Sequence, residues 1–550
     1  MENPYEANRQ TQFVPSKTIK IFPENQGVDV RAQGNGVSRI MFHLPEYILF
    51  LNPETFRIRF NMKMSGRHMP KPSKVAGVSS IIRHMRVQTG NAMVLLEELD
   101  EYSTACGIGY SYGQDLGIIQ DREINEGLSL TDNPAQQLFW SARSLPDVGY
   151  ETGTVAKNVA ISMPLKSGLL GPTGTSILPL GAMGGCRITL ETNTIRKSIV
   201  LANDASQGST GELEVKTQVT AAAWTGDLNK VIGIECTLDA TKVCRFEAGD
   251  SVYYVNAGGN TVLLGLVIGV QKDEADDVQL NVRGDVAASP ATGPLLAAGT
   301  KLFTKNEDIY NGWTPGPNMV GGGAAPAASI VSANVAAKIK VDYVLSDVES
   351  ICEQVSPPES YVNGLVSKLN SSAGLVMNYK NETLHKINLI GITGQLTASI
   401  PNTAKRVYSL LAAPINQNET FNANNITAPD TDFAQQYQWV INDQLVPDQR
   451  CSLRRMSPTP TPYVEQLHIQ ELRKGLMGAG VFVRSLQNAN ENFVIARQVA
   501  MYGSVSDITK SALSLRIEYS SQATRQKSLN VYVCSARTMI IRRGDVQVVY

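Results

Sequence analysis

The segment "VDYVLSDVESICEQVSPPESYVNGL", Val341 to Leu365, changes character at its midpoint. Its first part is rich in β-branched and aromatic residues, which favour a strand. Pro357 and Pro358 then stop any ladder, because proline offers no amide donor and restrains the residue before it. From Ser360 to Leu369 the apolar residues take helical spacing. We predict that Val341–Val355 closes one β body and that a short connector helix leads to a second, fixing the two rigidly side by side.

Alternating strands lie on both sides of this segment. In "FRIRFNMKM", Phe56 to Met64, apolar residues alternate with arginine, asparagine and lysine, which predicts a strand with one buried and one wet face. Turn-rich connections between such runs indicate an all-β sandwich rather than βαβ units. Similar runs occur at "CRITLETN" (Cys186–Asn193), "KIKVDYVL" (Lys338–Leu345), "LSLRIEY" (Leu513–Tyr519) and "LNVYVC" (Leu529–Cys534).

The two halves of the chain close with the same pair of runs. We expect the Cys186–Asn193 run to pair with the strand that begins near Lys338, and the Leu513–Tyr519 run to pair with the strand that begins at Leu529. This is a weak internal repeat, with a period of roughly 180 to 200 residues once an insertion is removed.

The length of 550 residues exceeds the roughly 250 to 300 at which a single core stops growing, so two or three domains are expected. We predict a tail, a first β body interrupted by an inserted domain, a connector and a second β body. Their residue ranges are 1–20 for the tail, 21–204 and 331–355 for the first body, 205–330 for the insertion, 356–372 for the connector and 373–550 for the second body.

The predicted insertion differs from the flanking segments in composition and residue pattern. It opens with "ASQGSTGE" and closes with "GWTPGPNMVGGGAAPAAS", which are linker-like segments rich in glycine, proline, serine and alanine. Between them, from Phe246 to Gly284, short apolar strands follow Gly-Asp, Gly-Gly-Asn and Asp-Asp turns. We predict a small β-barrel with spacing reminiscent of SH3-like barrels, inserted into a loop of the first body.

Few helices are expected besides the connector. Tyr463–Gly478 has helical spacing, with Gly478 as its C-cap. Asn133–Leu145 is the other candidate, with Asn133 as N-cap and Pro134 at the first helical position.

Charge and cysteine content exclude several classes of function. The formal net charge is -1, with 49 basic and 50 acidic side chains, so no strong direct nucleic-acid binding is expected. The 7 cysteines are scattered and never spaced as C-x-x-C, which suggests neither a zinc site nor a disulfide framework. No apolar run reaches the roughly 18 residues of a transmembrane helix, and no signal-peptide core is recognised.

The histidines and glycine-rich stretches offer little catalytic chemistry. The histidines show no ligand spacing, and we expect structural or surface roles for His43, His68, His84, His385 and His468. "CGIGYSYG" (Cys106–Gly113) lacks the dinucleotide-binding spacing, and "SGLLGPTGTS" (Ser167–Ser176) lacks the P-loop lysine, so both are predicted to be turns. "QKDEADD" (Gln271–Asp277) is predicted to be a solvated hairpin tip rather than a calcium site.

Paired carboxylates of a glycosidase are the remaining catalytic alternative. The densest acidic cluster is "LLEELDEY", with Glu97, Glu98, Asp100 and Glu101. The separation of two carboxylates in space decides that mechanism, and the sequence does not give it. The expected reading is an exposed acidic segment.

The order of segments resembles that of a known family. "IFPENQGVDVRAQGNGVSRIMFHLPEYILFLNPETFRIRFNMKMSG" (Ile21–Gly66), "IIRHMRVQTGNAMVLLEELDEY" (Ile81–Tyr102) and "MPLKSGLLGPTGTSILPLGAMGGCRITLETN" (Met163–Asn193) resemble the first half of double jelly-roll major capsid proteins of eukaryotic DNA viruses, in the group of polinton-like viruses and virophages. "YVLSDVESICEQV" with "SYVNGLVS" resembles the family's last strand of the first roll and its connector. In the second half the matching segments are "TAKRVYSLLAAP", "QWVINDQLVPDQRCSLRR", "QELRKGLMG" and "MIIRRGDVQVVY".

The resemblance covers most of the chain except 205–330, and it implies two tandem eight-stranded jelly rolls. It implies a homotrimer that forms a pseudo-hexagonal capsomer, with neighbouring capsomers and minor capsid, penton or cement proteins as partners in an icosahedral virion shell. Assembly would take place in the host cytoplasm or nucleus. No catalytic, cofactor or metal residues follow from it. The insertion would form an outer tower, with a host receptor as a possible partner.

Two alternatives remain open from the sequence. A β-sandwich adhesin or receptor-binding protein would use the inserted barrel to bind a ligand, and glycan binding by the 205–330 segment would support it. A carbohydrate-active enzyme would depend on the acidic cluster of residues 97–101, the only candidates for it.

Overall fold

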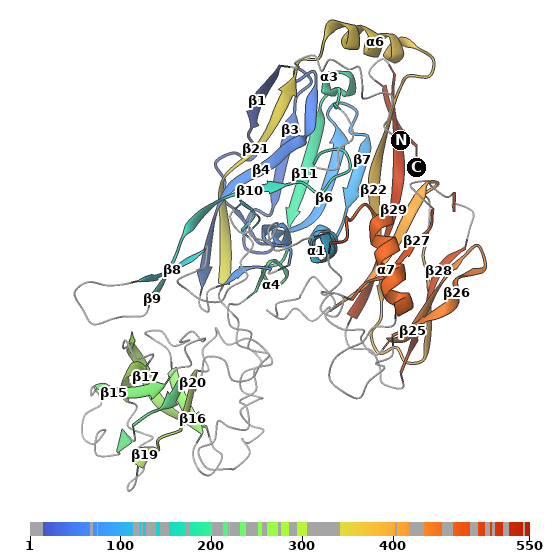
Figure 1. The fold of residues 1–550 in the computed structure, drawn as a ribbon. Helices are drawn as coiled ribbons and strands as arrows, with labels where there is room; N and C mark the ends of the chain where they lie inside the picture. Colours follow the sequence, from blue (N-terminus) through green and yellow to red (C-terminus); the bar gives the residue numbers. More distant parts are fainter. Residues whose placement is uncertain are drawn as a thin grey trace.

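The fold is described from a computed structural model of the chain (Figure 1). The described residues are 15–66, 70–73, 75–113, 122, 125–127, 139–143, 153–171, 177–200, 213–217, 219–220, 231–237, 251–255, 261–272, 277–284, 294–304, 341–401, 404–416, 434–453, 466–484, 493–500, 507–508, 512–520, 527–542 and 545–549.

The first β body is a sandwich of two antiparallel sheets. One sheet has the order β1-β21-β4-β10, and β2 also pairs with β21; the other has the order β3-β11-β6-β7. In chain order the eight main strands thus lie as first-eighth-third-sixth and second-seventh-fourth-fifth, which is a jelly roll. Their bounds are β1 Ser16–Ile21, β2 Val30–Arg31, β3 Arg39–Leu44, β4 Leu51–Gly66, β6 Ile82–Thr89, β7 Leu95–Leu99, β10 Asn158–Pro164, β11 Cys186–Thr192 and β21 Val341–Val355.

The second β body repeats this order. Its sheets are β22-β29-β24-β27, with β30 added beside β29, and β23-β28-β25-β26. The prediction of two tandem eight-stranded jelly rolls is therefore confirmed. The bounds are β22 Leu375–Asn388, β23 Gln395–Ser399, β24 Val407–Asn416, β25 Ala434–Ile441, β26 Gln444–Ser452, β27 Ile495–Gln498, β28 Leu513–Tyr519, β29 Lys527–Arg542 and β30 Asp545–Val549.

Strand β4 shows how the alternating pattern builds the first core. Its apolar side chains point inward and are at most 3% exposed, whereas the polar residues between them face outward. The alternation predicted for Phe56–Met64 is confirmed. The buried members are Phe56, Ile58, Phe60, Met62 and Met64.

The predicted pairing of the closing strands is wrong in both halves. β11 pairs with β3 and β6, whereas β21 pairs with β1, β2 and β4. In the second roll, β28 pairs with β23 and β25, whereas β29 pairs with β22 and β24. The reason is the jelly-roll path, which places the seventh and eighth strands in opposite sheets.

Between β11 and β21 the chain contains a closed barrel of order β13-β15-β18-β17-β16-β20, drawn apart from both rolls in Figure 1. Val215, Ile234, Val252, Leu280 and Leu302 belong to its core. The strands here are β12 Ile199–Val200, β13 Leu213–Val215, β14 Val219–Thr220, β15 Val231–Thr237, β16 Ser251–Val255, β17 Thr261–Lys272, β18 Asp277–Gly284, β19 Pro294–Leu296 and β20 Lys301–Thr304. β12 pairs with β5, and β14 pairs with β19.

The helices are few, as expected, but two local predictions are wrong. Cys106–Gly113 is not a turn: it forms most of α1, whose small residues let it lie buried against η1 and β6. Within the predicted helix 133–145, Trp140–Arg143 forms β8, paired with β9, and 133–138 and 144–145 lie outside the described residues. The remaining bounds are η1 Val78–Ile81, α1 Tyr102–Gly113, α3 Leu180–Met183, α4 Ile195–Ser198, α6 Glu359–Asn370, α7 Gln466–Gly478, β5 Lys71–Pro72, β8 Trp140–Arg143 and β9 Gly153–Ala156.

Two other segments can be compared with their predictions. Residues 16–20 are not a free tail, because β1 pairs with β21 along its whole length. The connector helix is present as α6. Of the predicted helix Tyr463–Gly478, residues Gln466–Gly478 form α7 and 463–465 lie outside the described residues; the positive φ that follows α7 belongs to Gly480 rather than Gly478.

Candidate functional site

The two jelly rolls meet along an interface that we call the seam. It is formed by β7, α1 and the loop 165–171 of the first roll, and by β22, β29 and residues 479–484 of the second. In Figure 1, β7 and β22 stand side by side where the rolls meet.

The seam is continuous with the apolar cores. A single buried cluster includes core residues of the first roll and also residues of the β22-β29-β24-β27 sheet that point away from the second roll's own core. The equivalent outward face of the first roll's β4 is polar, with Arg57, Arg59, Asn61 and Lys63. The two rolls thus share a strand order but differ on the outward face of one sheet. In the second roll this face packs against the first roll, whereas the matching face of the first roll is polar. The second-roll members of the cluster include Leu411, Ala413, Ile415, Tyr532 and Cys534.

Side chains of the second roll cap backbone carbonyls of the first. β7 is an edge strand, so its outward carbonyls need partners from elsewhere. The Tyr379 hydroxyl donates to the Leu96 carbonyl at 2.5 Å, and Arg537 Nη1 donates to the same oxygen at 3.0 Å. The Tyr532 hydroxyl donates to the Glu101 carbonyl at 3.2 Å. Burial raises the pKa of Tyr532 well above its ordinary value, which keeps it a donor.

Glu101 forms an ionic bridge across the seam. The Glu101 side chain is 7% exposed. Its Oε1 atom lies 3.2 Å from Lys197 Nζ of the first roll and 3.0 Å from Lys386 Nζ of the second. Burial alone would raise the pKa of Glu101, but the two ammonium groups outweigh burial and lower it. The carboxylate therefore stays ionised and joins the rolls through charge.

Lys166 and Glu382 form a second ion pair across the seam, with Nζ and Oε1 2.6 Å apart. The two side chains are 28% and 20% exposed. Burial alone would lower the pKa of Lys166, but the Glu382 carboxylate outweighs burial and raises it. At this exposure the pair orients the rolls more than it stabilises them.

Glu97 binds the loop 165–171 from within the first roll. Its carboxyl group accepts hydrogen bonds from the Gly168 amide, at 2.8 Å, and from the Ser167 hydroxyl. Ser167 Oγ in turn accepts the amides of Leu169 and Leu170, at 3.2 and 2.9 Å. Burial, followed by the Glu382 charge, raises the pKa of Glu97 to about 7, although the Gly168 and Ser167 hydrogen bonds oppose the shift.

The same loop presses against the second roll. A Cβ atom placed on Gly168 would lie 1.9 Å from the Lys380 carbonyl oxygen, so only glycine permits this approach. Gly480, with φ +88°, lies beside the Lys380 side chain, and a Cβ there would be 2.4 Å from Lys380 Nζ. The backbones of the two rolls are thus packed directly against each other around β22.

Residues 479–484, which follow α7, also line the seam. The Val481 amide donates to the Leu476 carbonyl at 2.9 Å, and the Arg484 amide donates to the Tyr112 carbonyl of α1 at 2.9 Å. Helix α7 itself lies on β27 and β24, where Gly475 fits against Ala496 with no room for a Cβ. The second roll therefore reaches the first through a segment anchored at both ends.

The acidic cluster of residues 97–101 does not form an exposed segment, so that prediction is wrong for two of its members. Taken as whole residues, Glu97 and Glu101 are each 5% exposed, and both bind the seam groups described above. Glu98 lies on the opposite side of β7, with Arg86 at 2.6 Å and His84 at 3.0 Å. Asp100 lies 3.8 Å from Arg83. The four carboxylates point to different partners rather than toward one reaction centre.

The structure describes parts of two other candidate sites, the glycine-rich Ser167–Ser176 and the acidic Gln271–Asp277. Ser167–Gly171 belongs to the seam loop, and 172–176 lie outside the described residues. β17 and β18 pair up to Lys272 and Val278, which frames the predicted hairpin tip, while 273–276 lie outside the described residues.

The described histidines lie in regular elements. His43 is in β3, His84 in β6 and His385 in β22, while His68 lies outside the described residues. His468 of α7 is fully buried, 2.9 Å from the Tyr437 hydroxyl and stacked on Phe493. Burial lowers its pKa to about 4, so it is a neutral core residue.

Within the residues that the structure describes, no group of three or more histidine, cysteine or acidic side chains is arranged to bind a metal. The cysteines described there are buried and form no disulfide: Cys106, Cys186, Cys236, Cys352, Cys451 and Cys534. Within the same residues, no helix has the length and apolarity needed to cross a membrane.

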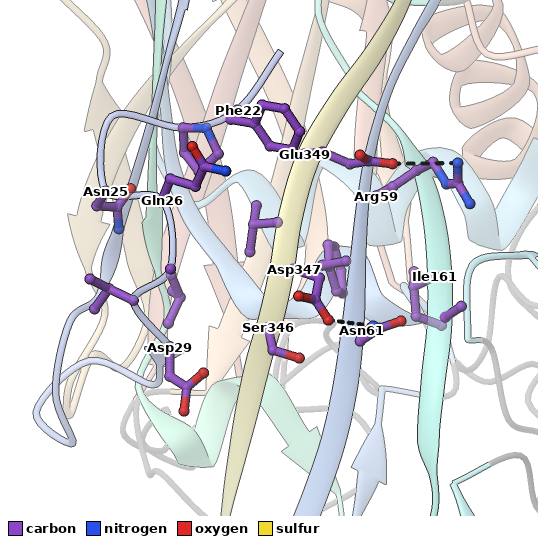
Figure 2. A pocket seen from close by; sticks show the side chains of 17 residues that line it. Phe22, Asn25, Gln26, Asp29, Arg59, Asn61, Ile161, Ser346, Asp347 and Glu349 are labelled. Carbon is purple, nitrogen blue, oxygen red and sulfur yellow. Dashed lines mark hydrogen bonds and ion pairs between the residues drawn. The ribbon is translucent and has the colours of Figure 1, made fainter. Parts of the chain in front are cut away.

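A groove of about 480 Å³ lies beside a bulge in β21 (Figure 2). Ser346 is opposite Asn61, but Glu349 is opposite Arg59, so β21 carries one extra residue here. Asp347 takes φ 52° and accepts a hydrogen bond from Asn61 Nδ2 at 2.7 Å, while Glu349 pairs with Arg59 at 3.4 Å. These contacts, visible in Figure 2, join β4 to β21, so the Asp347 and Glu349 carboxylates already have partners within the lining of the groove.

Most seam residues were missed by sequence reasoning. Lys166, Tyr379, Glu382, Lys386 and Arg537 are distant in the chain from the groups they bind, and none belongs to a recognisable motif. The one available signal was the acidic cluster itself.

Comparisons with known proteins found likeness in structure only. No protein-family model matches the chain, and no curated protein sequence matches it. Among solved structures, a PBCV-1 virus capsid model aligns with 7% identity and TM-score 0.49, covering 99% of this chain and 98% of that one. The Faustovirus major capsid protein aligns with 7% identity and TM-score 0.47, covering 97% and 92%. The mavirus major capsid protein aligns with 8% identity and TM-score 0.42, covering 100% and 95%. At these identities the likeness concerns the fold, and the double jelly roll rests on the strand orders and pairings given above.

Proposed function

We propose that this chain is a major capsid protein, three copies of which form a pseudo-hexagonal capsomer that tiles the icosahedral shell of a virion. The observation that carries the proposal is the repeated strand order within one chain, with both copies held together by the seam. Three such chains supply six similar units, which a closed ring can place at the corners of a hexagon. The order of sequence segments supports the same role.

The proposal includes the division of the chain and its partners. The 205–330 insertion is an outer tower and a candidate receptor-binding element, which the barrel between β11 and β21 supports. The partners are other copies of the chain, then neighbouring capsomers and minor capsid, penton or cement proteins. The role is structural rather than enzymatic, which the engagement of Glu97 and Glu101 in the seam supports.

The test is the mass and outline of the purified protein. Light scattering at micromolar concentration should give about three times 59.6 kDa. Electron microscopy should show a hexagonal outline of about 80–90 Å, the size of six packed sandwiches with loops. A strict monomer at that concentration contradicts the proposal, and an elongated unbranched particle would favour an adhesin instead.

A further inference from the structure

We propose that one copy of this chain binds the next through a repeat of the seam, in which the edge strand β26 of one copy lies on the outward face of β1, β21 and β4 of its neighbour. We call this outward face, which carries Lys20, Arg57, Arg59 and Lys63, the open face. The proposal rests on the proposed ring of three chains and names the two surfaces that meet in it.

The repeated strand order leaves one edge and one face to be matched. Within the chain, β7 is the last strand of its sheet in the first roll and contacts the outward face of β22 and β29 in the second. Strand β26 holds the position of β7 in the second roll, and β1 and β21 hold the positions of β22 and β29 in the first. In Figure 1, β1 and β26 stand on opposite outer sides of the two rolls. An edge on one side and a matching face on the other make a head-to-tail contact, which forms a ring when its rotation closes.

The open face has the polarity expected of a contact between separately folded copies. The matching face of the second roll is apolar, because its partner belongs to the same chain. Lys20, Arg57 and Arg59 of the open face have side chains that are 56%, 38% and 46% exposed. Interfaces between copies that are first soluble alone are about as polar as the rest of a protein surface. The exposed Phe22 and Val28, which line the groove beside β21, add an apolar part.

Lys20 holds the place on the open face that Tyr379 holds in the seam. Tyr379 is the fifth residue of β22 and is opposite Arg537 of β29. Lys20 is the fifth residue of β1 and is opposite Ile351 of β21. Its Nζ atom lies 3.3 Å from Glu349. Because a lysine ammonium group has several donors, Lys20 can bind a further acceptor as Tyr379 does.

The matching position on the edge strand is Leu445. It is the second residue of β26, and Leu96, whose carbonyl accepts the Tyr379 hydroxyl in the seam, is the second residue of β7. Outward carbonyls of an edge strand need donors from elsewhere. Leu445 is exposed, as is Asp448 further along β26. We therefore expect Lys20 of one copy to lie beside Leu445 of the next, with Asp448 facing the basic side chains of the open face.

Cross-linking of the full chain tests this contact. Lys20→Cys and Leu445→Cys, combined in one chain, place a thiol on each surface, and a short bismaleimide should join them between copies into covalent trimers. The native cysteines among the described residues are buried, so they should not react. The matched control combines Lys20→Cys with Thr397→Cys, because Thr397 is exposed on β23 at the opposite edge of the same sheet. This pair should give no covalent trimer.

A change of charge tests the role of Lys20. Lys20→Glu should raise the dissociation constant of the trimer at least about tenfold, because it replaces an interface donor with a group that repels carbonyl oxygens and Asp448. Lys17→Glu is the matched control, since it makes the same change of charge on the same strand, on the side of β1 that faces away from the open face. It should leave the dissociation constant unchanged. Sedimentation over a range of concentrations measures both.

The outcomes are distinct. A trimer in which the Lys20→Cys and Leu445→Cys pair gives no covalent link overturns the proposed contact and leaves the proposed function standing. Equal weakening by Lys20→Glu and Lys17→Glu also overturns the contact. If a variant does not fold, hydrogen exchange of wild type decides: residues 444–450 should exchange more slowly in the trimer than in dissociated copies, and equal exchange overturns the proposal. A strictly monomeric wild type overturns the contact and the proposed function together.

Discussion

Replacing Gly168 with alanine should separate the two jelly rolls locally without disturbing either sandwich. The added methyl group would lie 1.9 Å from the Lys380 carbonyl oxygen and 2.8 Å from its carbon. Both are backbone atoms in a strand paired along its length with β29, so neither can swing aside. Since Gly168 is not among the glycines with positive φ, alanine is not strained by its own backbone there, and the effect measures the approach of the rolls.

The magnitude follows from how far the contact must open. Real Cβ atoms essentially never come closer than 3.0 Å, so the loop or β22 must retreat by about 1 Å. Overpacking of this kind costs about 1–3 kcal/mol. A shift of the loop also stretches the 2.8 Å hydrogen bond from the Gly168 amide to Glu97, which adds about 1 kcal/mol. We expect a total loss of about 2–4 kcal/mol.

Denaturant unfolding of wild type and Gly168→Ala measures this loss, and hydrogen exchange locates it at residues 165–171 and 378–384. Gly364→Ala is the matched control, because a Cβ at Gly364 in the exposed helix α6 meets nothing within 4 Å. The control should be stabilised by about 0.5–1 kcal/mol, as expected for glycine to alanine in a helix. If Gly168→Ala unfolds with wild-type stability, or if both variants lose stability equally, the close approach at the seam is refuted.

Two further predictions concern the seam. Lys386→Ala removes one of two cations from Glu101, and we expect a loss of about 1–2 kcal/mol at neutral pH, discounted because Lys386 is 46% exposed. Since the pKa of Glu101 is lowered in the folded state, this contribution to stability is present above the ordinary carboxyl range and disappears as pH falls through the folded-state pKa. The stabilities of wild type and variant, measured by thermal unfolding, should therefore become equal in acid. Tyr379→Phe removes the donor to the Leu96 carbonyl and should cost about 1 kcal/mol by denaturant unfolding, independently of pH from about 5 to 8; a pH-dependent loss would contradict this reasoning.

The sequence was informative where one short pattern decides the outcome. The alternation at Phe56–Met64 gave a strand with one buried face, and the two prolines after Val355 marked the end of β21. These features depend on neighbouring residues only, because side-chain direction in a strand repeats every second residue.

Pairing and burial were predictable only in part, because they depend on contacts between distant residues. The partners of Glu97 and Glu101 lie about seventy to nearly three hundred residues away, at Ser167, Lys197 and Lys386. An acidic run with no visible cations therefore looked solvated. In α1, glycine and serine content argued against a helix, but burial against η1 and β6 overrides that weak intrinsic preference.

The rigidity of the joint between the rolls has a different source from the one the sequence suggested. A short connector was expected to fix the angle between the rolls; α6 contributes to this through a small contact, since Leu365 is its one buried residue and packs with Phe50 and Val355. The seam constrains the angle between the rolls better. Two donors bind one Leu96 oxygen, Glu101 binds a lysine from each roll, and Gly168 packs so closely against the β22 backbone that a Cβ does not fit. Hydrogen bonds and close backbone contacts are directional, so they fix orientation as well as distance. A chain whose two halves must keep one angle would therefore tolerate changes in the connector more readily than changes in β7 or β22.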